Sequence, residues 1–424
     1  MKQKTTTEKF IYECIDCGKQ YNRSEAIYLC PKCSKGNNDL NPPKGVLRIV
    51  YNFFKNREKN ILFNDLKKKN FLQLLPIQNT SSLPRLKVGH TPLYEFNELN
   101  QKKLPFRLFL KDDSQNPTFS FKDRASALVS AYAKENRLST IVTASTGNAG
   151  SSLAGICAAQ KQKAIIMVPE KAPLAKLTQI LMYGATIIPV KGTYDNAFDL
   201  SIKATKEFGW YNRNTAYNPL TIEGKKTVSF EIYDQMNKST PDKIFVPVGD
   251  GVIISGVYKG FEDLLNLQII YKMPIIVAVQ SEGSNNLTRN LNNKNFKIKK
   301  SDTIADSISV DIPRNFNMAK HFIKKYNGEY ITVSDQSILE ASSILSKNTG
   351  IFAEPAAATS FAGLLNYYRH HKLNSNSKNV VLLTGSGLKD LNAVQSMLKI
   401  PDSIEPNIEN LKKIFHDYFY FKRS

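Results

Sequence analysis

The chain has 424 residues, of which 42% are hydrophobic and 22% charged, with 21 glycines and 19 prolines. This composition is typical of a folded globular protein and excludes collagen-like, coiled-coil and low-complexity chains. The formal net charge of +21 raises the question of a polyanionic partner. The short basic runs at 67–69 and 297–300 lack interleaved aromatic side chains, which favours a solvated basic surface over nucleic-acid binding.

The first ten residues, MKQKTTTEKF, contain no apolar signal core. Nowhere do about 18 apolar residues run together, as a membrane-spanning helix would need. We therefore expect a soluble cytoplasmic protein.

Four of the five cysteines, Cys14, Cys17, Cys30 and Cys33, form the pattern C-x2-C-x12-C-x2-C. Two close pairs on two turns let four thiolates converge tetrahedrally on zinc, and four sulfur ligands leave no open position, so the metal would be structural. The alternative, two disulfides of a secreted domain, is disfavoured by the missing signal peptide. Cys157 stands alone in an apolar helical stretch, where a buried thiol packs as a small hydrophobe.

Short apolar runs, each followed by a helix-like stretch, begin after a polar, Lys-rich segment at 45–105. Strands that alternate with helices predict the α/β class, with parallel sheets covered on both faces. Ligands of such sheets bind beyond the carboxyl ends of the strands, so the loops there are candidate sites. The predicted strands are Ile141–Thr143, Ala164–Val168, Thr186–Val190, Lys243–Val248, Pro274–Val279 and Asn379–Leu383.

The loop after the first of these strands contains Ser145, Thr146, Gly147 and Asn148 and leads into an Ala-rich helix. Hydroxyls and free amides at a helix N-terminus can bind an anion such as a carboxylate. The same side chains can also serve only as helix N-caps. The loop alone does not decide between these two interpretations.

A glycine-rich turn with Gly249 and Gly251 follows the strand predicted at 243–248 and leads into another helix. Its amides and the helix dipole suit a phosphate. A P-loop would need Lys followed by Ser or Thr where the chain has Val257, and the Rossmann fingerprint would need glycine in place of Ile254. Kinase-like and NAD-binding functions are therefore disfavoured, and a compact monophosphate remains.

Lys122 begins a helix predicted to run to about Glu135, directly after an apolar Phe. A positive helix field and desolvation both lower a lysine pKa toward nucleophilic use. The alternative is that Lys122 pairs with Asp123 or with solvent and has no catalytic role. Thr384, in a further strand-to-loop passage, could face an aromatic nitrogen or simply belong to a turn. No G-x-S-x-G or H-E-x-x-H motif is present, which disfavours serine hydrolase and zinc protease chemistry.

Taken together and in this order, these segments resemble the fold type II pyridoxal-phosphate (PLP) enzymes, and most closely the threonine synthase family. The similarity covers about residues 85–398, and the cysteine ribbon before it is also similar to that of many threonine-synthase-like proteins. The shared motifs are SFKDR (120–124), STGNAG (145–150), NPLTIEGKKT (218–227), the VPVG turn at 246, AEPAAA (353–358) and TGSGLKD (384–390).

The resemblance implies a tryptophan synthase β-like fold of two three-layer parallel-sheet domains behind an N-terminal zinc ribbon. It implies that Lys122 binds the cofactor through its amine and, once freed by substrate, acts as the general acid/base. Asn148 would bind the pyridoxal 3-oxygen, Thr384 would face the pyridine nitrogen, and Glu354 with Pro355 would border the ring. The substrate carboxylate would lie at Ser145, Thr146 and Gly147. The cofactor phosphate would lie at Gly249, Asp250, Gly251, Val252 and Ile253.

The implied reaction is that of a lyase that converts O-phospho-L-homoserine and water to L-threonine and phosphate. Thr221, however, stands where threonine synthases usually carry an Arg that grips the substrate phosphate, and Phe119 and Ala125 replace residues that are commonly Gly. Lys225, Lys226 or Lys87 would have to compensate for that Arg. One alternative is therefore a PLP-dependent β-elimination or β-replacement enzyme acting on serine, threonine or phosphoserine. Another is a non-enzymatic nucleic-acid binder.

The expected organisation is a ribbon at 1–42, a large domain from 43–133 and 246–400, a smaller mobile domain at 134–245, and a C-terminal helix at 401–424. We expect this helix, which carries several aromatic residues, to dock on the body or on a second subunit. The resemblance also implies a homodimer.

Overall fold

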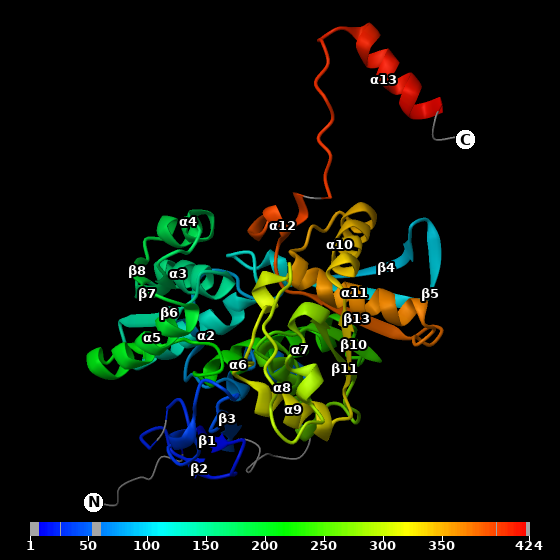
Figure 1. Ribbon diagram of the computed structural model, residues 1–424. Coiled ribbons are helices and arrows are strands. Elements are labelled where there is room, and N and C mark those ends of the chain that lie inside the picture. The colour runs from blue at the N-terminus through cyan, green and yellow to red at the C-terminus, as the bar shows by residue number, and fades with distance from the viewer. Residues whose placement is uncertain (1–7, 26, 53–60, 396, 421–424) are drawn as a thin grey trace, which may run out of the picture.

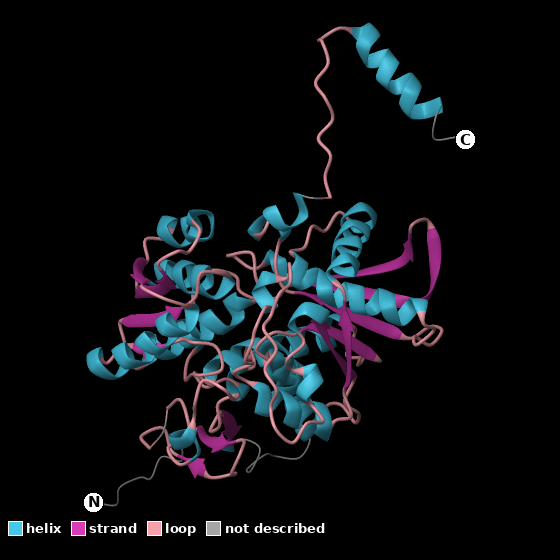
Figure 2. Cartoon of the chain, in the orientation of Figure 1, coloured by secondary structure: helices cyan, strands magenta, loops and turns pink. Residues whose placement is uncertain are grey.

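The computed structural model describes residues 8–25, 27–52, 61–395 and 397–420, with side chains of the last helix described to residue 414. Three sheets organise this part of the chain, and helices lie on both faces of the two larger ones (Figures 1 and 2). All six strands predicted from the apolar runs are present, so the α/β prediction is confirmed. Among the described residues, no helix is long and apolar enough to cross a membrane.

The largest sheet has six strands, and all its neighbouring pairs are parallel except the hairpin of β4 and β5. Along the central strand β10, Ile244 and Val246 enter one core and Phe245 enters the core on the opposite face, because strand side chains alternate. In sheet order the strands are β12 (Glu329–Val333), β11 (Ile275–Ser281), β10 (Lys243–Pro247), β13 (Lys378–Leu383), β5 (Lys102–Asp112) and β4 (Leu93–Leu99).

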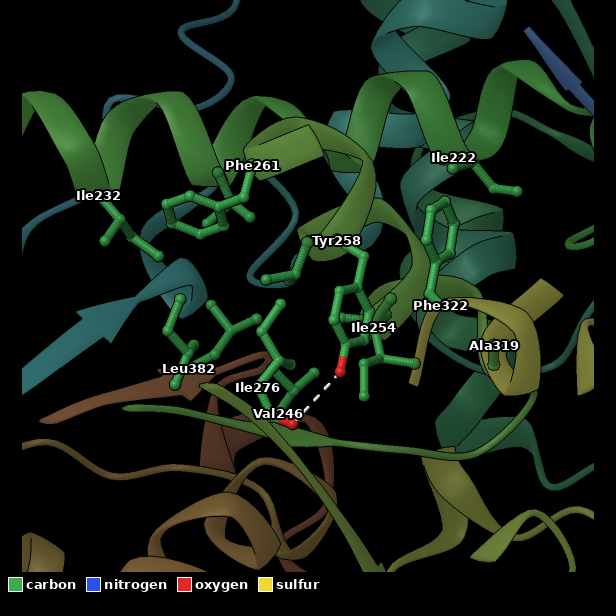
Figure 3. Packing of buried hydrophobic residues seen from close by; sticks show 14 of the residues in the cluster. Ile222, Ile232, Val246, Ile254, Tyr258, Phe261, Ile276, Ala319, Phe322 and Leu382 are labelled. Atoms are coloured by element: carbon green, nitrogen blue, oxygen red, sulfur yellow. Dashed lines mark hydrogen bonds between the residues drawn. The ribbon is translucent and has the colours of Figure 1, made fainter. Parts of the chain in front are cut away.

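Helices pack against both faces of this sheet and complete the two hydrophobic cores. Figure 3 shows the first core, in which Tyr258 and Phe261 pack over Val246 and Ile276, and the Tyr258 hydroxyl donates to the Ile276 carbonyl at 3.4 Å. The helices on this side are α6 (Leu220–Lys225), α7 (Thr227–Gln235), α8 (Val252–Asn266) and α9 (Phe316–Lys325). The opposite face is covered by α10 (Asp335–Thr349) and α11 (Pro355–Arg369).

The second sheet is wholly parallel, with strands β8 (Thr186–Val190), β7 (Lys163–Pro169), β6 (Thr140–Ala144) and β9 (Tyr211–Asn212) in that order. Its apolar residues pack on one side against α2 (Lys122–Glu135) and α3 (Asn148–Gln160) and on the other against α5 (Tyr194–Phe208). Helix α4 (Leu174–Met182) packs beside α3. Cys157 is fully buried in the first of these cores, as expected for a packing residue.

The N-terminal module is a small antiparallel sheet of β2 (Gln20–Tyr21), β1 (Phe10–Cys14) and β3 (Leu47–Tyr51), followed by α1 (Phe63–Lys68). Phe10, Tyr12 and Tyr51 share a core with α2, so the module is packed on the body. At the other end, α12 (Asn392–Gln395) precedes α13 (Ile408–Tyr420), which lies away from the body at the end of an extended segment (Figure 1). The expected docking of this helix on the body is therefore absent from the described structure.

Candidate active site and metal centre

The four cysteines of the N-terminal motif converge on one point. Their sulfur atoms all lie within 4.8 Å of one another, and all four are free thiols. Four thiolates at about 2.3 Å from a tetrahedral zinc ion lie roughly 3.8 Å apart, and the Cys17 and Cys30 sulfurs are separated by 3.9 Å. The cluster fits a closed structural metal site, and the disulfide alternative finds no support.

Lys122 is the first residue of α2, and the loops that surround it are joined by main-chain hydrogen bonds. The Phe121 amide donates to the Thr384 carbonyl at 2.9 Å, and Glu354 N donates to the Gly385 carbonyl at 3.1 Å. Phe119, just before the lysine, has a φ of +66°, and its carbonyl accepts from Ser386 N at 3.1 Å. The motifs SFKDR, AEPAAA and TGSGLKD, distant in sequence, therefore meet at the lysine.

The surroundings of Lys122 favour its neutral amine. Burial lowers the pKa of Lys122, the nearby charge of Arg213 lowers it further, and the carboxylates of Glu354 and Asp250 act in the opposite direction. A partly desolvated lysine of lowered pKa is suited to attack a carbonyl carbon. Its position at the start of a 14-residue helix adds to the effect.

Glu354 links this lysine to the start of α3. The Asn148 side-chain nitrogen lies 3.0 Å from each carboxylate oxygen of Glu354 and donates to them. Burial raises the pKa of Glu354, while Asn148 and Lys122 oppose that shift. The AEPAAA motif pointed to this glutamate, but its bond to Asn148 could not be predicted because the two residues are far apart in the sequence. The prediction that Asn148 binds the pyridoxal oxygen remains a prediction.

The loop before α3 uses part of its hydrogen-bonding capacity within the loop itself. The Ser145 hydroxyl accepts from the Gly147 amide at 3.2 Å, so part of its bonding capacity serves the loop itself. Thr146 and Gly147 are partly exposed at the start of the 13-residue helix. The first-turn amides of a helix have no intrahelical partners and are available to an anion. The carboxylate-binding role of the loop stays a prediction.

The glycine turn before α8 contains two positions at which the backbone favours glycine. Gly251 has φ +85°, and a Cβ at Gly249 would lie 2.9 Å from the Ile308 Cα, so a larger residue would clash there. Val252 and Ile253 direct their side chains into the core and leave only main-chain amides for a ligand. The Asp250 carboxylate accepts from Arg314 N at 3.0 Å, so Asp250 too would serve a phosphate through its amide.

Two cationic side chains near Lys122 are buried and incompletely satisfied. Among the described residues, Lys225 Nζ and Arg213 Nη1 have no hydrogen-bond partner. Thr221, by contrast, donates to the carbonyl of Asn218, just before α6, at 2.8 Å and is therefore satisfied locally. Sequence reasoning named Lys225 only as one possible compensation and missed Arg213, which belongs to no recognised motif.

The comparisons with known proteins agree with this geometry. The family model described as "Pyridoxal-phosphate dependent enzyme" matches residues 85–385. A threonine synthase of Methanocaldococcus jannaschii is 35% identical over 416 residues, which cover 96% of this chain and 100% of the relative. The chain belongs to the threonine synthase family. A family member from Halalkalibacterium halodurans, also a threonine synthase, is 33% identical over 80% of this chain and 94% of its own.

Solved structures show the fold type II architecture. Diaminopropionate ammonia lyase from Escherichia coli has a TM-score of 0.64 at 19% identity, covering 82% of this chain and 96% of its own. Threonine deaminase isoform 2 from Solanum lycopersicum has a TM-score of 0.63 at 20% identity, covering 81% and 96%. At such identities the likeness concerns the fold alone. The predicted family and fold are confirmed.

Proposed function

We propose that this threonine synthase family member converts O-phospho-L-homoserine and water to L-threonine and phosphate, with PLP bound at Lys122. The observation that carries the proposal is the position of Lys122, which lies where the SFKDR, AEPAAA and TGSGLKD motifs meet and where burial lowers its pKa. PLP supplies an aldehyde for the lysine and an electron sink for the substrate carbons.

Some residues around Lys122 would bind the cofactor and the substrate, and Lys122 itself would transfer protons. The amides of the turn from Gly249 to Ile253 would hold the cofactor phosphate, and the Thr384 hydroxyl would bind at the ring nitrogen. A hydroxyl there does not keep the ring protonated as an Asp would, which favours elimination over transamination. The freed Lys122 amine moves protons at the substrate carbons, while the Ser145–Gly147 loop holds the carboxylate and so fixes which bond can break.

A second candidate keeps the cofactor and changes the substrate. Thr221 is fully buried and its hydroxyl is hydrogen-bonded to Asn218. It therefore provides no positive charge for the substrate phosphate at the position where threonine synthases usually carry an Arg. This favours β-elimination or β-replacement on serine, threonine or phosphoserine. The zinc site is structural in either case, and homodimerisation remains part of the proposal.

One assay separates the two candidates. The PLP-loaded protein is given phosphohomoserine, serine, threonine or phosphoserine, and threonine, inorganic phosphate and keto acid are measured. The proposal predicts equal amounts of threonine and phosphate from phosphohomoserine. Keto acid from serine or threonine, without turnover of phosphohomoserine by fully loaded enzyme, would replace it with the second candidate.

A further inference from the structure

The two unsatisfied cations identified above are an unusual feature of the described chain. Lys225 and Arg213 are each 0% exposed, yet Lys225 Nζ and Arg213 Nη1 have no hydrogen-bond partner among the described residues. Buried donors are nearly always paired, and a buried charge is strongly unfavourable without a counter-ion. An anion that is not part of the chain would satisfy both groups.

Their anchoring places both cations beside Lys122. The Arg213 Nε donates to Ser126 Oγ at 3.1 Å, and its Nη2 donates to the Lys122 carbonyl at 3.5 Å. These contacts fix the guanidinium on the first turn of α2 and leave Nη1 free among the described groups. Arg213 therefore lies next to the residue expected to carry the cofactor.

Lys225 reaches the same region from α6. A Cβ built on Gly256 of α8 would lie 2.7 Å from the Lys225 Cβ, so the end of α6 is pressed against the start of α8. Burial lowers the pKa of Lys225, and the charges of Arg213 and Lys122 lower it further, with Asp250 opposing them. The three cations therefore lie close enough to lower one another's pKa. The carboxylates that act on them are Asp250 on Lys225 and Lys122, Glu354 on Lys122, and Asp123 on Arg213.

Asp250 does not neutralise this cluster by direct contact. Its side chain accepts from Arg314 N at 3.0 Å, and among the described residues Lys225 Nζ and Arg213 Nη1 form no hydrogen bond with it. The Asp123 and Glu354 carboxylates accept from Thr118 and Asn148, and Lys225 Nζ and Arg213 Nη1 keep no partner among the described residues. An anion with several acceptor oxygens for separate donors, such as phosphate, would satisfy both groups.

The position of Lys225 on α6 suggests which phosphate is bound. Thr221, where the family usually carries an Arg, is four residues before Lys225 on α6. Residues at i and i+4 of a helix lie one above the other on the same face. The positive charge missing at 221 is thus restored one turn later on that face. The cofactor phosphate already has the amides of the glycine turn.

We propose that Lys225 and Arg213 bind the phosphate group of a phosphorylated amino-acid substrate, in place of the arginine whose position Thr221 occupies. This inference rests on the proposed function, because it assigns a residue pair to the substrate of that same site. The phosphate group bound by this pair could belong to the substrate or to the cofactor. The experiment therefore measures the affinity for inorganic phosphate and the affinity for PLP separately.

The test compares the PLP-loaded protein with Lys225→Met, and with Lys103→Met as the matched control on an exposed strand. Inorganic phosphate is titrated while the cofactor absorbance band is followed, and PLP affinity is measured on the same proteins. We expect Lys225→Met to weaken inorganic phosphate binding by about 30-fold, as loss of a charge-assisted hydrogen bond does, and to leave PLP affinity within about twofold. The control should match the parent in both.

Phosphate binding that is unchanged in Lys225→Met would overturn the proposal, and so would a loss of PLP affinity as large as the loss of phosphate affinity. Folding gives an independent readout. The substitution removes a buried amine that has no hydrogen-bond partner among the described residues. Lys225→Met should therefore raise the melting temperature of the phosphate-free protein, and added phosphate should reduce the difference in melting temperature between variant and parent. A lower melting temperature in phosphate-free buffer would contradict the inference.

The proposed function can fail separately. If phosphohomoserine is not converted while phosphate binding still depends on Lys225, the substrate assignment is wrong and the phosphate site stands, with phosphoserine as the next substrate to test. If phosphohomoserine is converted and Lys225→Met leaves its KM unchanged, the function stands and the assignment of Lys225 is overturned.

Discussion

A buried ion network links the N-terminal module to the helices that approach the site, and its disruption gives a sharp stability test. Lys226 Nζ lies 2.5 Å from a Glu223 oxygen and 2.7 Å from an Asp263 oxygen, and Lys259 also pairs with Asp263. Tyr51 of β3 donates to Glu223 at 2.5 Å. Two lysines thus face two carboxylates with almost no solvent access.

Replacing Glu223 with Gln removes one of the two carboxylate partners of Lys226, which then shares the Asp263 carboxylate with Lys259. Removal of one partner from a buried pair costs about 3 to 5 kcal/mol, and for a chain of this size that corresponds to a fall of about 5 °C in the melting temperature. The matched control is Glu95→Gln, because the Glu95–Arg107 pair is about half exposed and exposed pairs contribute at most ~1 kcal/mol.

The assay is thermal unfolding of the PLP-loaded protein followed by circular dichroism, with the visible cofactor band recorded in parallel. We expect Glu223→Gln to melt well below Glu95→Gln. A melting temperature for Glu223→Gln equal to that of the control would refute the reasoning, because it would mean that the network carries no net stabilisation.

Three further predictions follow from other parts of the chain. Cys30→Ser should lower bound zinc well below about one ion per chain and expose the N-terminal module to limited proteolysis while the cofactor band persists; a fully zinc-loaded variant would contradict the metal site. The Arg124 and Lys111 cations hold the pKa of Glu231 below its ordinary value against the opposing effect of burial. The stabilising contribution of Glu231 should therefore be complete above about pH 4.3 and should be lost as the pH falls below that. A free energy of unfolding of Glu231→Gln that decreases with acid as steeply as that of the parent would refute this. Phe119→Gly should be about 1 kcal/mol more stable than Phe119→Ala in chemical unfolding, because glycine tolerates φ +66° and alanine does not; equal stability would show that the backbone there is not strained.

The fold class and the cysteine cluster could be predicted because local patterns determine them. Continuous apolar runs mark strands that are buried on both faces, and all six such predictions correspond to observed strands. The predicted helix from Lys122 to about Glu135 matches the bounds of α2. The cysteine spacing likewise predicted a convergence of sulfurs that the structure contains.

Features that depend on long-range packing were missed. β4 and β5 fall partly in a segment described only as polar, because β4 is an edge strand with exposed side chains such as Glu95 and its periodicity is weak. The bond between Asn148 and Glu354 joins residues 206 positions apart. The unpaired nitrogen of Arg213 likewise becomes visible only when its buried neighbours are known.

The central claim is that Lys122 binds the cofactor, and covalent mapping tests it most directly. The protein is loaded with PLP, reduced with borohydride and digested, and the modified peptide is identified by mass spectrometry. We predict a visible absorbance band before reduction, a label on Lys122 afterwards, and neither in Lys122→Ala. A label on Lys225 or Lys389, whose pKa values are also lowered by burial, or no label on any lysine, would contradict the account.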